Sequence, residues 1–284
     1  MRSDSDSASI SFYGVRGSVP TPGKATMGIG GNTPCLLIEC DDQLIICDCG
    51  TGMRVLGDQL LNKYHDGLKA TIMPSHLHLD HLTGLPFFNP IYSKKNSFTF
   101  IGGFNDGQLE KVLQDLMKAP LFPVSFIKLD SKLNFISPPK ATFNIGSINI
   151  IPYLCNHPGG SWGWRFNFSN GKSLVHVTDN EPKDQETAEK MIAWMKGADI
   201  LIHDAQYTPK EYEGLRRGWG HSPYTYPIEL AAKAGIPSLY LFHHSPDYDD
   251  KKLKGILKDA KAFAKKNHFN VKLLLSYEGL NVVL

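Results

Sequence analysis

Short apolar runs rich in β-branched and aromatic residues, separated by glycine and proline, dominate the first half of the chain. These runs predict strands at residues 10–13, 35–39, 44–48, 70–74 and 98–101, and then at 124–129, 148–153, 163–168 and 173–178. Between the two sets, Leu109, Val112, Leu113 and Leu116 recur at helical spacing. Residues 106–118 are therefore expected to form the first clear surface helix.

The period of the apolar positions changes in the second half. Helical spacing predicts helices at residues 187–196, 228–234 and 250–266, which alternate with strands at 200–203, 239–242 and, to close the series, 271–275. Strands followed by helices in each half are typical of a layered α/β fold, in which two sheets pack together under outer helices. Since no domain-sized linker interrupts the pattern, we expect one domain at 10–284 after a disordered, serine-rich lead at 1–9.

Composition narrows the class of protein without identifying it. The 284 residues are 42% hydrophobic and 20% charged, as in an ordinary soluble globule, and the formal net charge is only +2. A protein that binds long nucleic acid mainly by neutralising its phosphates needs a far more positive net charge. The lysine-rich residues 249–272 are interpreted as the solvated face of an amphipathic helix. With no secretory signal and no apolar run of about 20 residues, the chain is expected to be cytoplasmic, with no membrane partner.

Histidine is the unusual residue, with 11 copies against five cysteines that form no CxxC pair. The run SHLHLDH, residues 75–81, directly follows the predicted strand at 70–74. His76 and His78 can converge on one ion from a strand end, whereas Asp80 and His81 fall in the following turn and can face a second. Imidazole and carboxylate together favour zinc, with manganese and iron as alternatives.

This run resembles the HxHxDH motif of the metallo-β-lactamase superfamily. Four other segments resemble that superfamily's motifs in the same order: DCGTG at 48–52, NHP at 156–158, HVTD at 176–179 and LFHHSP at 241–246. The resemblance implies a four-layer αββα sandwich with one or two metal ions at one edge. A single motif can arise by chance, but chance does not account for five in order.

The resemblance also implies that five histidines and two aspartates bind two divalent cations. These residues are His76, His78 and His157 for one ion, Asp80, His81 and His243 for the other, and Asp179 as a bridge. Two such ions, about 3.5–4 Å apart, would stabilise the attacking and leaving oxygens of a displacement, and Asp80 would also orient the attacking hydroxide. From the residues alone, His157 can instead be a surface or core residue, Asp179 an N-cap, and His244 the ligand in place of His243.

Two further segments, IHDA at 202–205 and GWGHS at 218–222, resemble the tRNase Z-like phosphodiesterase branch. In that branch His221 would act as general acid for a poor leaving group, a contribution of about 10² to 10⁴-fold; its alternative is capping or packing before Pro223. The tRNA-gripping arm of those endonucleases commonly lies between the third histidine and the bridging aspartate. Only 21 residues separate His157 from Asp179, so the resemblance is closer to armless phosphodiesterases.

We therefore expect a metal-dependent hydrolase in which Asp80 and His221 are catalytic and a metal-bound hydroxide attacks a small phosphodiester such as a cyclic nucleotide. Arg216 and Arg217 would clamp its phosphate, since arginine offers a planar pair of donors. The neighbouring aromatic residues would stack a base or, more simply, pack in the core: Trp162, Trp164, Tyr207 and Trp219.

Other readings of the sequence remain open. The enzymatic alternatives are a lactonase or thioesterase-type hydrolase and an RNA 3′-processing endonuclease. A non-catalytic metal-binding module is a third, which the complete set of ligand residues disfavours. Long nucleic acid is not an expected partner. Homodimers are common in the family that the chain resembles, but no segment of the sequence indicates a dimer interface.

Overall fold

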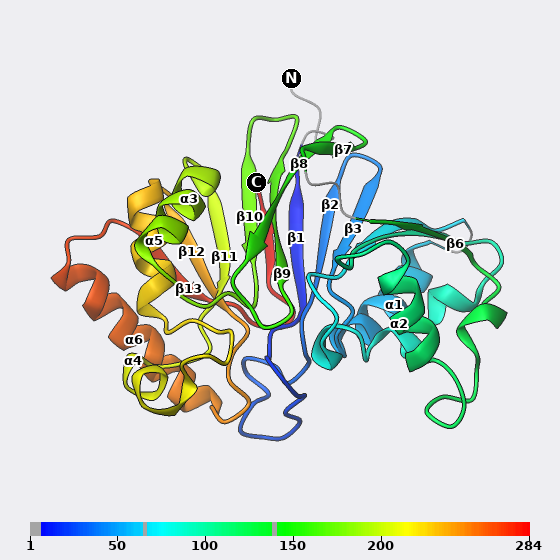
Figure 1. Ribbon diagram of the computed structural model, residues 1–284, viewed down its shortest axis with the longest axis horizontal. Coiled ribbons are helices and arrows are strands. Elements are labelled where there is room, and N and C mark those ends of the chain that lie inside the picture. The colour runs from blue at the N-terminus through cyan, green and yellow to red at the C-terminus, as the bar shows by residue number, and fades with distance from the viewer. Residues whose placement is uncertain (1–6, 65–66, 138–140) are drawn as a thin grey trace.

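Two seven-stranded sheets lie at the centre of the molecule, and helices cover their outer faces (Figure 1). The computed structural model describes residues 7–64, 67–137 and 141–284. The first sheet has the strand order β14-β1-β2-β3-β4-β5-β6, and the second β13-β12-β11-β10-β9-β8-β7. The predicted four-layer αββα order is confirmed.

The central strands bury residues on both of their faces because both faces of each sheet are covered. In β2, Leu36 and Ile38 join the core between the sheets, whereas Cys35 and Leu37 join the core beneath the helices. The first sheet comprises β1 (Ser9–Gly14), β2 (Cys35–Cys40), β3 (Gln43–Cys47), β4 (Lys69–Met73), β5 (Ser97–Ile101), β6 (Lys132–Ile136) and β14 (Asn281–Val283). The second comprises β7 (Phe143–Ile145), β8 (Ile148–Cys155), β9 (Ser161–Asn167), β10 (Ser173–Val177), β11 (Ile200–Asp204), β12 (Ser238–Phe242) and β13 (Lys272–Leu275).

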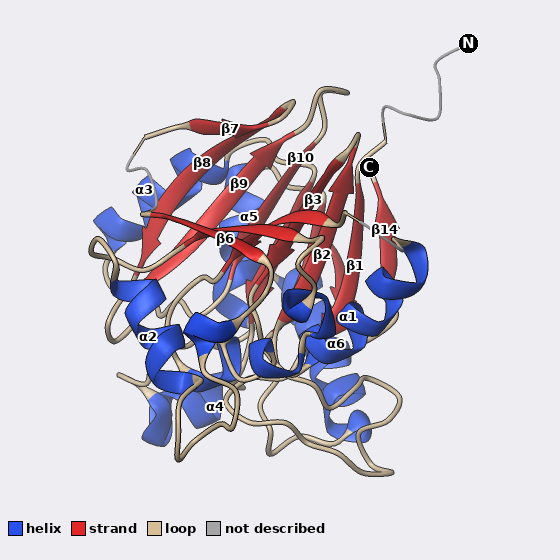
Figure 2. Cartoon of the chain, turned by 90° about the vertical axis from the view of Figure 1, so that its right-hand side faces the viewer, coloured by secondary structure: helices blue, strands red, loops and turns tan. Residues whose placement is uncertain are grey.

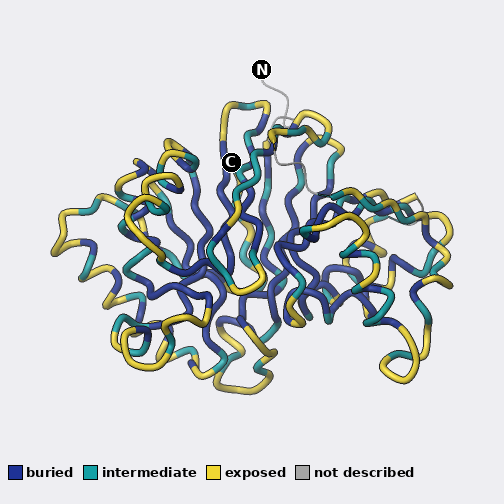
Figure 3. The backbone as a smooth tube through the Cα atoms, viewed as in Figure 1, coloured by how far each residue is buried: buried dark blue, intermediate teal, exposed yellow. Residues whose placement is uncertain are grey.

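The longer helices pack against the sheets through their buried residues, and Figure 2 shows them around the strands in a side view. α1 (Gly52–Lys63) and α2 (Gln108–Leu116) cover the first sheet; α3 (Gln185–Met195), α5 (Thr225–Ala234) and α6 (Asp250–Lys266) cover the second, and α4 (Pro209–Glu211) is a single turn. α6 buries Leu253, Ile256, Ala260 and Ala264 and exposes most of its lysines, so exposed and buried positions alternate around it (Figure 3). Among the described residues, no helix combines the length and hydropathy needed to cross a membrane.

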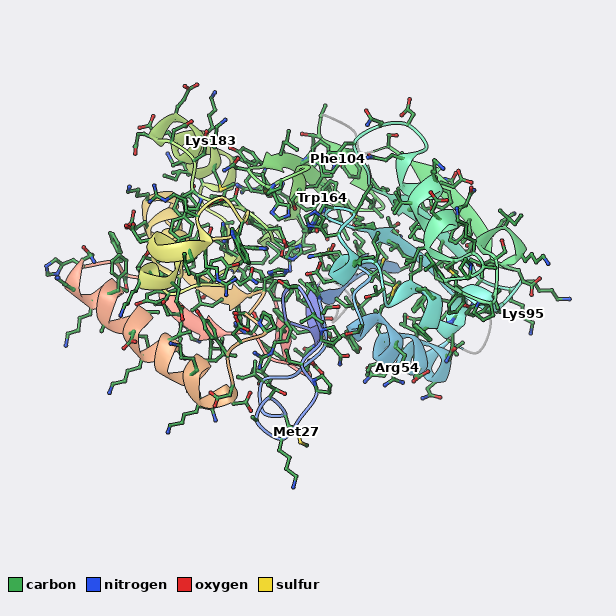
Figure 4. All side chains as sticks on the ribbon, turned by 60° about the horizontal axis from the view of Figure 1, so that its bottom comes forward. Met27, Arg54, Lys95, Phe104, Trp164 and Lys183 are labelled. Atoms are coloured by element: carbon green, nitrogen blue, oxygen red, sulfur yellow. The ribbon has the colours of Figure 1, made fainter. Side chains whose placement is uncertain are left out.

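The strand directions bring several carboxyl ends to one edge of the sandwich. β3 pairs parallel with β4, and β10, β11 and β12 pair parallel with one another. β8 runs in the direction of β10 because both are antiparallel to β9. The segments that follow these strands therefore meet at one edge, the lower one in Figure 1, which is turned toward the viewer in Figure 4. All the predicted metal-binding residues lie in these segments.

Several predicted elements are wrong in position or type. The first helix is α1, which precedes the helix predicted at 106–118. The sequence pattern misses α1 because Gly52 and Gly57 weaken the helical signal of Met53, Leu56 and Leu60. The run at 124–129 forms a 3₁₀ turn at Phe126–Lys128 rather than a strand. The pattern does not predict β6, β7 or β14, so the strand at 271–275 does not close the series.

The last residues of the predicted lead at 1–9 are ordered. Residues 1–6 lie outside the described residues, but Ala8 is fully buried and Ser9 begins β1. The N–H of Leu284 donates to the carbonyl of Ala8 at 2.8 Å, and Ser9 pairs with Val283 of β14. The last residues of the chain therefore order this part of the lead.

Two helical glycines give a matched test of this packing. A Cβ on Gly57 in α1 would lie 2.9 Å from the Phe88 ring, whereas a Cβ on Gly255 in α6 meets nothing within 4 Å. We expect Gly255→Ala to raise the free energy of unfolding by about 0.5–1 kcal/mol and Gly57→Ala to lower it by about 1–3 kcal/mol. Denaturant titration of both variants measures this; stabilisation by both would contradict the close packing of α1 on Phe88.

His176 of β10 predicts a dependence of stability on pH. It is buried with no hydrogen-bond partner on either ring nitrogen, and burial lowers its pKa to about 4 from an ordinary value of 6.5. Between these values the unfolded chain binds a proton that the folded chain excludes, so stability falls as the pH drops through this window. Relative to His176→Leu, the wild type should lose about 2 kcal/mol between pH 8 and pH 5. Denaturant titration at each pH measures the free energy of unfolding of both proteins. If both lose the same amount between pH 8 and pH 5, His176 is not the cause of the pH dependence.

Candidate metal centre

The predicted metal-binding residues come from four segments, each following the carboxyl end of a strand. The SHLHLDH run follows β4, His157 follows β8, Asp179 follows β10 and His243 follows β12. Asp179 and His243 have left-handed backbones, with φ of 55° and 54°. Such a conformation is unfavourable outside glycine and persists only where the surroundings fix it, often at a functional site.

His76, His78 and His157 form a first group of donors. Nε2 of His157 lies 3.1 Å from Nδ1 of His78, and Nε2 of His76 is buried without a hydrogen-bond partner. The ring centroids of the three histidines are 4.4, 4.7 and 4.9 Å apart. One nitrogen of each ring thus faces a common point.

Asp80, His81 and His243 form a second group. The Nε2 atoms of His81 and His243 are 3.3 Å apart, and Oδ2 of Asp80 lies 3.4 Å and 3.3 Å from them. The backbone N–H of Ser18 donates to the same carboxylate oxygen at 2.7 Å. The loop after β1 therefore fixes the orientation of Asp80.

Asp179 lies between the two groups and presents one oxygen to each. Its Oδ1 is 3.7 Å from Nε2 of His76 and 3.8 Å from Nε2 of His157, and its Oδ2 is 3.2 Å and 3.3 Å from Nε2 of His81 and His243. Burial alone would raise the pKa of Asp179, but the imidazoles of His243 and His81 outweigh it and hold that pKa well below its ordinary value. The side chain is placed as a bridging ligand requires.

The spacing of these donors fits divalent cations. In a tetrahedral site with Zn–N bonds of about 2.0–2.1 Å, neighbouring donor atoms lie about 3.3 Å apart. The separations of 3.2–3.4 Å within the second group and to Asp179 match that edge. Without a cation, Nε2 of His76 would be left buried and unpaired, which is costly. Nitrogen and oxygen donors without thiolates suit zinc, manganese or iron.

Further contacts decide which ring nitrogens face the centre. Nδ1 of His157 donates to the carbonyl of Gly220 at 2.9 Å, which leaves its Nε2 with a lone pair. Nδ1 of His81 lies 3.1 Å from Oδ1 of Asp48, which also accepts the backbone N–H of Ser75 at 2.7 Å. Such partners orient metal-binding imidazoles and raise their basicity.

His221 stands beside both groups. Its ring centroid is 5.4 Å from that of His157 and 5.0 Å from that of His243. Its Nδ1 lies 3.5 Å from Oδ2 of Asp204 and 3.5 Å from Oδ1 of Asp179. Burial lowers the pKa of His221, but these two carboxylates outweigh it and raise the pKa. A protonated imidazole at the centre is thereby favoured.

Other predicted residues lie farther out or face elsewhere. His244 donates from Nε2 to the carbonyl of Ser276 at 2.9 Å, so its ring points away from the centre, unlike that of His243. Arg216 pairs with Asp247 at 3.3 Å on the rim, and Arg217 pairs with Glu213 at 3.6 Å and is largely exposed. Neither arginine contacts the donor groups in the described interactions. Trp164 packs in the core between the sheets.

Sequence reasoning assigned no role to three supporting carboxylates. Asp48 backs His81, Asp204 backs His221, and Glu181 accepts the backbone N–H groups of Gly218 and Gly220 at 2.6 Å and 2.9 Å. Asp48 and Asp204 lie at strand ends within the DCGTG and IHDA segments, so their positions in the sequence could have indicated a role near the centre. Glu181 offers none, because its partners lie 37 and 39 residues away in the sequence.

A family comparison agrees with this geometry. The model of a beta-lactamase superfamily domain matches residues 43–244, which is more than half of the chain and includes both donor groups. The chain belongs to the beta-lactamase superfamily. This confirms the superfamily predicted from the motifs, and the superfamily together with the donor cluster identifies a metal-dependent hydrolase.

This superfamily member is similar in sequence to ribonuclease Z and in fold to several solved structures. Ribonuclease Z of Thermoplasma acidophilum is 25% identical over an alignment 316 positions long, gaps included, which covers 95% of each chain. The metallo-beta-lactamase fold protein YhfI from Bacillus subtilis has a TM-score of 0.73 at 18% identity and covers 98% of this chain and 100% of its own. A diphosphatase of the PhnP family has a TM-score of 0.67 at 18% identity over 97% of each chain. The fold and the similarity to ribonuclease Z are both as the sequence predicts.

Substitution of the proposed bridge tests the centre. Asp179→Asn removes the negative charge between the two donor groups. Asp48→Asn changes only the carboxylate that contacts Nδ1 of His81, and we expect it to weaken zinc binding roughly 10- to 100-fold. The loss of zinc affinity in Asp179→Asn should be larger. Chelator competition and elemental analysis measure both. Asp259→Asn, on the exposed face of α6, is the control. Unchanged metal content and affinity in Asp179→Asn would remove the basis for a bridging role.

Proposed function

We propose that this chain is a phosphodiesterase with two divalent cations, zinc being favoured, that acts on a small phosphodiester such as a cyclic nucleotide. His76, His78 and His157 would hold one cation and Asp80, His81 and His243 the other, with Asp179 shared. The observation that carries the proposal is the position of His221, whose ring lies 5.0–5.4 Å from a candidate ligand ring of each group.

The proposed chemistry divides between the cations and the chain. Two divalent cations would supply Lewis-acid charge that activates water and stabilises the negative charge of the displacement. Asp80, held by the Ser18 N–H, would orient the attacking water. His221 would donate a proton to the leaving oxygen, with Asp204 beside Nδ1 stabilising its protonated form.

A leaving alkoxide needs this proton, which is why His221 favours a phosphodiester over a thioester, whose thiolate leaves without one. A lactone also expels an alkoxide, so His221 alone does not separate a lactonase from a phosphodiesterase. A lactonase or thioesterase-type hydrolase is the second candidate. A substrate panel of lactones and phosphodiesters, with zinc and with manganese, separates the two.

The small size of the substrate rests on the segment between His157 and Asp179. It forms the antiparallel strands β9 and β10, so within this described interval no arm projects from the sandwich. The net charge of +2 also supports a small substrate.

RNA 3′-end processing is the alternative that the similarity to ribonuclease Z favours. It predicts cleavage of a tRNA precursor at low enzyme concentration. The main proposal predicts turnover of cyclic or dinucleoside phosphodiesters and weak action on the precursor. If metal-loaded protein leaves bis(p-nitrophenyl) phosphate and all nucleotide phosphodiesters intact, phosphodiesterase function is excluded.

His221→Ala tests the acid role. We expect metal content to stay the same while kcat falls roughly 10² to 10⁴-fold on an alkyl phosphodiester. The loss should be much smaller on bis(p-nitrophenyl) phosphate, whose leaving group needs no proton. His268→Ala, in the exposed turn that follows α6, is the control for loss of a histidine outside the centre. Equal losses on the two esters would argue that His221 serves only packing.

A further inference from the structure

Aromatic and cationic side chains form a row from His221 to the surface. The Tyr207 ring lies 6.0 Å from the His221 ring, and the Arg216 guanidinium lies 5.6 Å from the Tyr207 centroid. The same guanidinium lies over the Trp219 ring at 4.4 Å. The row is buried at its inner end, where Tyr207 is 4% exposed, and open at its outer end, where Trp219 is 54% exposed.

The exposure of Trp219 distinguishes it from the other tryptophans. Trp162 and Trp164 are 9% and 0% exposed, and the Trp162 indole N–H donates to the carbonyl of Gly103 at 3.0 Å. Trp194 is half-buried and packs against Tyr153 at 4.8 Å. Trp219 is thus the exposed tryptophan, lies two residues along the chain from the proposed acid, and takes no part in the core clusters.

The backbone around Trp219 is firmly held. Gly218 and Gly220 flank it, both with left-handed backbones at φ of 87° and 86°, and both donate their N–H groups to the buried carboxylate of Glu181. The Tyr212 hydroxyl donates to Glu181 as well, at 3.0 Å. The ring is therefore preorganised, so that a ligand stacking on it need not order a loose loop.

The guanidinium of Arg216 is fixed from two sides. It stacks on Trp219 and pairs with Asp247 at 3.3 Å, in the loop that follows His243. With Arg216 over the indole, more than half of the Trp219 surface stays open to solvent. A planar aromatic group can stack on such a platform, and the adjacent cation favours a ligand that also carries a phosphate.

We infer that Trp219 and Arg216 form a nucleobase subsite, which makes the substrate a nucleoside-containing phosphodiester. This inference rests on the proposed function. His221 protonates the leaving oxygen, so the leaving group lies on its side of the centre. Trp219 lies on the same side, and the base it stacks therefore belongs to the leaving half of the substrate.

Phosphomonoesters, which resemble the phosphate with its leaving half still attached, test the subsite without turnover of a phosphodiester. Adenosine 5′-monophosphate and ribose 5-phosphate, which differ only in the base, are titrated into the metal-loaded protein by calorimetry. We expect the wild type to bind the nucleotide roughly tenfold or more tightly than the sugar phosphate. In Trp219→Ala the two affinities should converge through weaker nucleotide binding alone, and Trp219→Phe should keep most of the difference.

Leu215→Ala is the matched control, since Leu215 is 85% exposed on the neighbouring turn and should leave both affinities unchanged. The inference is overturned if the wild type does not discriminate between the ligands, if Trp219→Ala discriminates as the wild type does, or if it loses both ligands equally. Absence of phosphodiester cleavage by the wild type would instead defeat the proposed function, so the two failures are distinct.

Discussion

The centre depends on one buried carboxylate between two clusters of imidazoles. A charged Asp179 in the interior is costly unless its charge is matched, and each of its oxygens faces a pair of imidazole nitrogens. The imidazole nitrogens around it approach one another to 3.1–3.3 Å, which is about the spacing of donor atoms that share one cation. Two cations, as proposed, would balance the carboxylate charge and bind these nitrogen atoms.

The sheets supply the rigidity that such a centre needs. Parallel pairing, together with the shared direction of β8 and β10, brings the ends of β4, β8, β10 and β12 to one edge. Donors that are far apart in the sequence therefore meet without long loops. A ring of partners then fixes their orientation: Asp48 behind His81, the Gly220 carbonyl behind His157 and the Ser18 N–H on Asp80. Glu181 connects this ring to the outer rim, because the loop that it binds carries both Trp219 and His221.

Features encoded in a short stretch of sequence could be predicted from the sequence alone. The SHLHLDH run places four donors within six residues, and α6 shows an uninterrupted helical stripe, so both are readable from the chain alone. The helix α1 is obscured by its glycines, and β14 is only three residues long and is stabilised by pairing with β1. The roles of Glu181 and Asp204 depend on contacts with the 218–222 segment, which no local periodicity reveals. The run at 124–129 has strand-like composition, but it buries Phe126 in the core and forms a 3₁₀ turn at Phe126–Lys128.

Anomalous diffraction at the zinc edge, from crystals of the protein grown with zinc, tests the central claim most directly. The account predicts two peaks, one among His76, His78 and His157 and one among Asp80, His81 and His243, with Asp179 in contact with both. A single peak, or peaks held by other side chains, would contradict it.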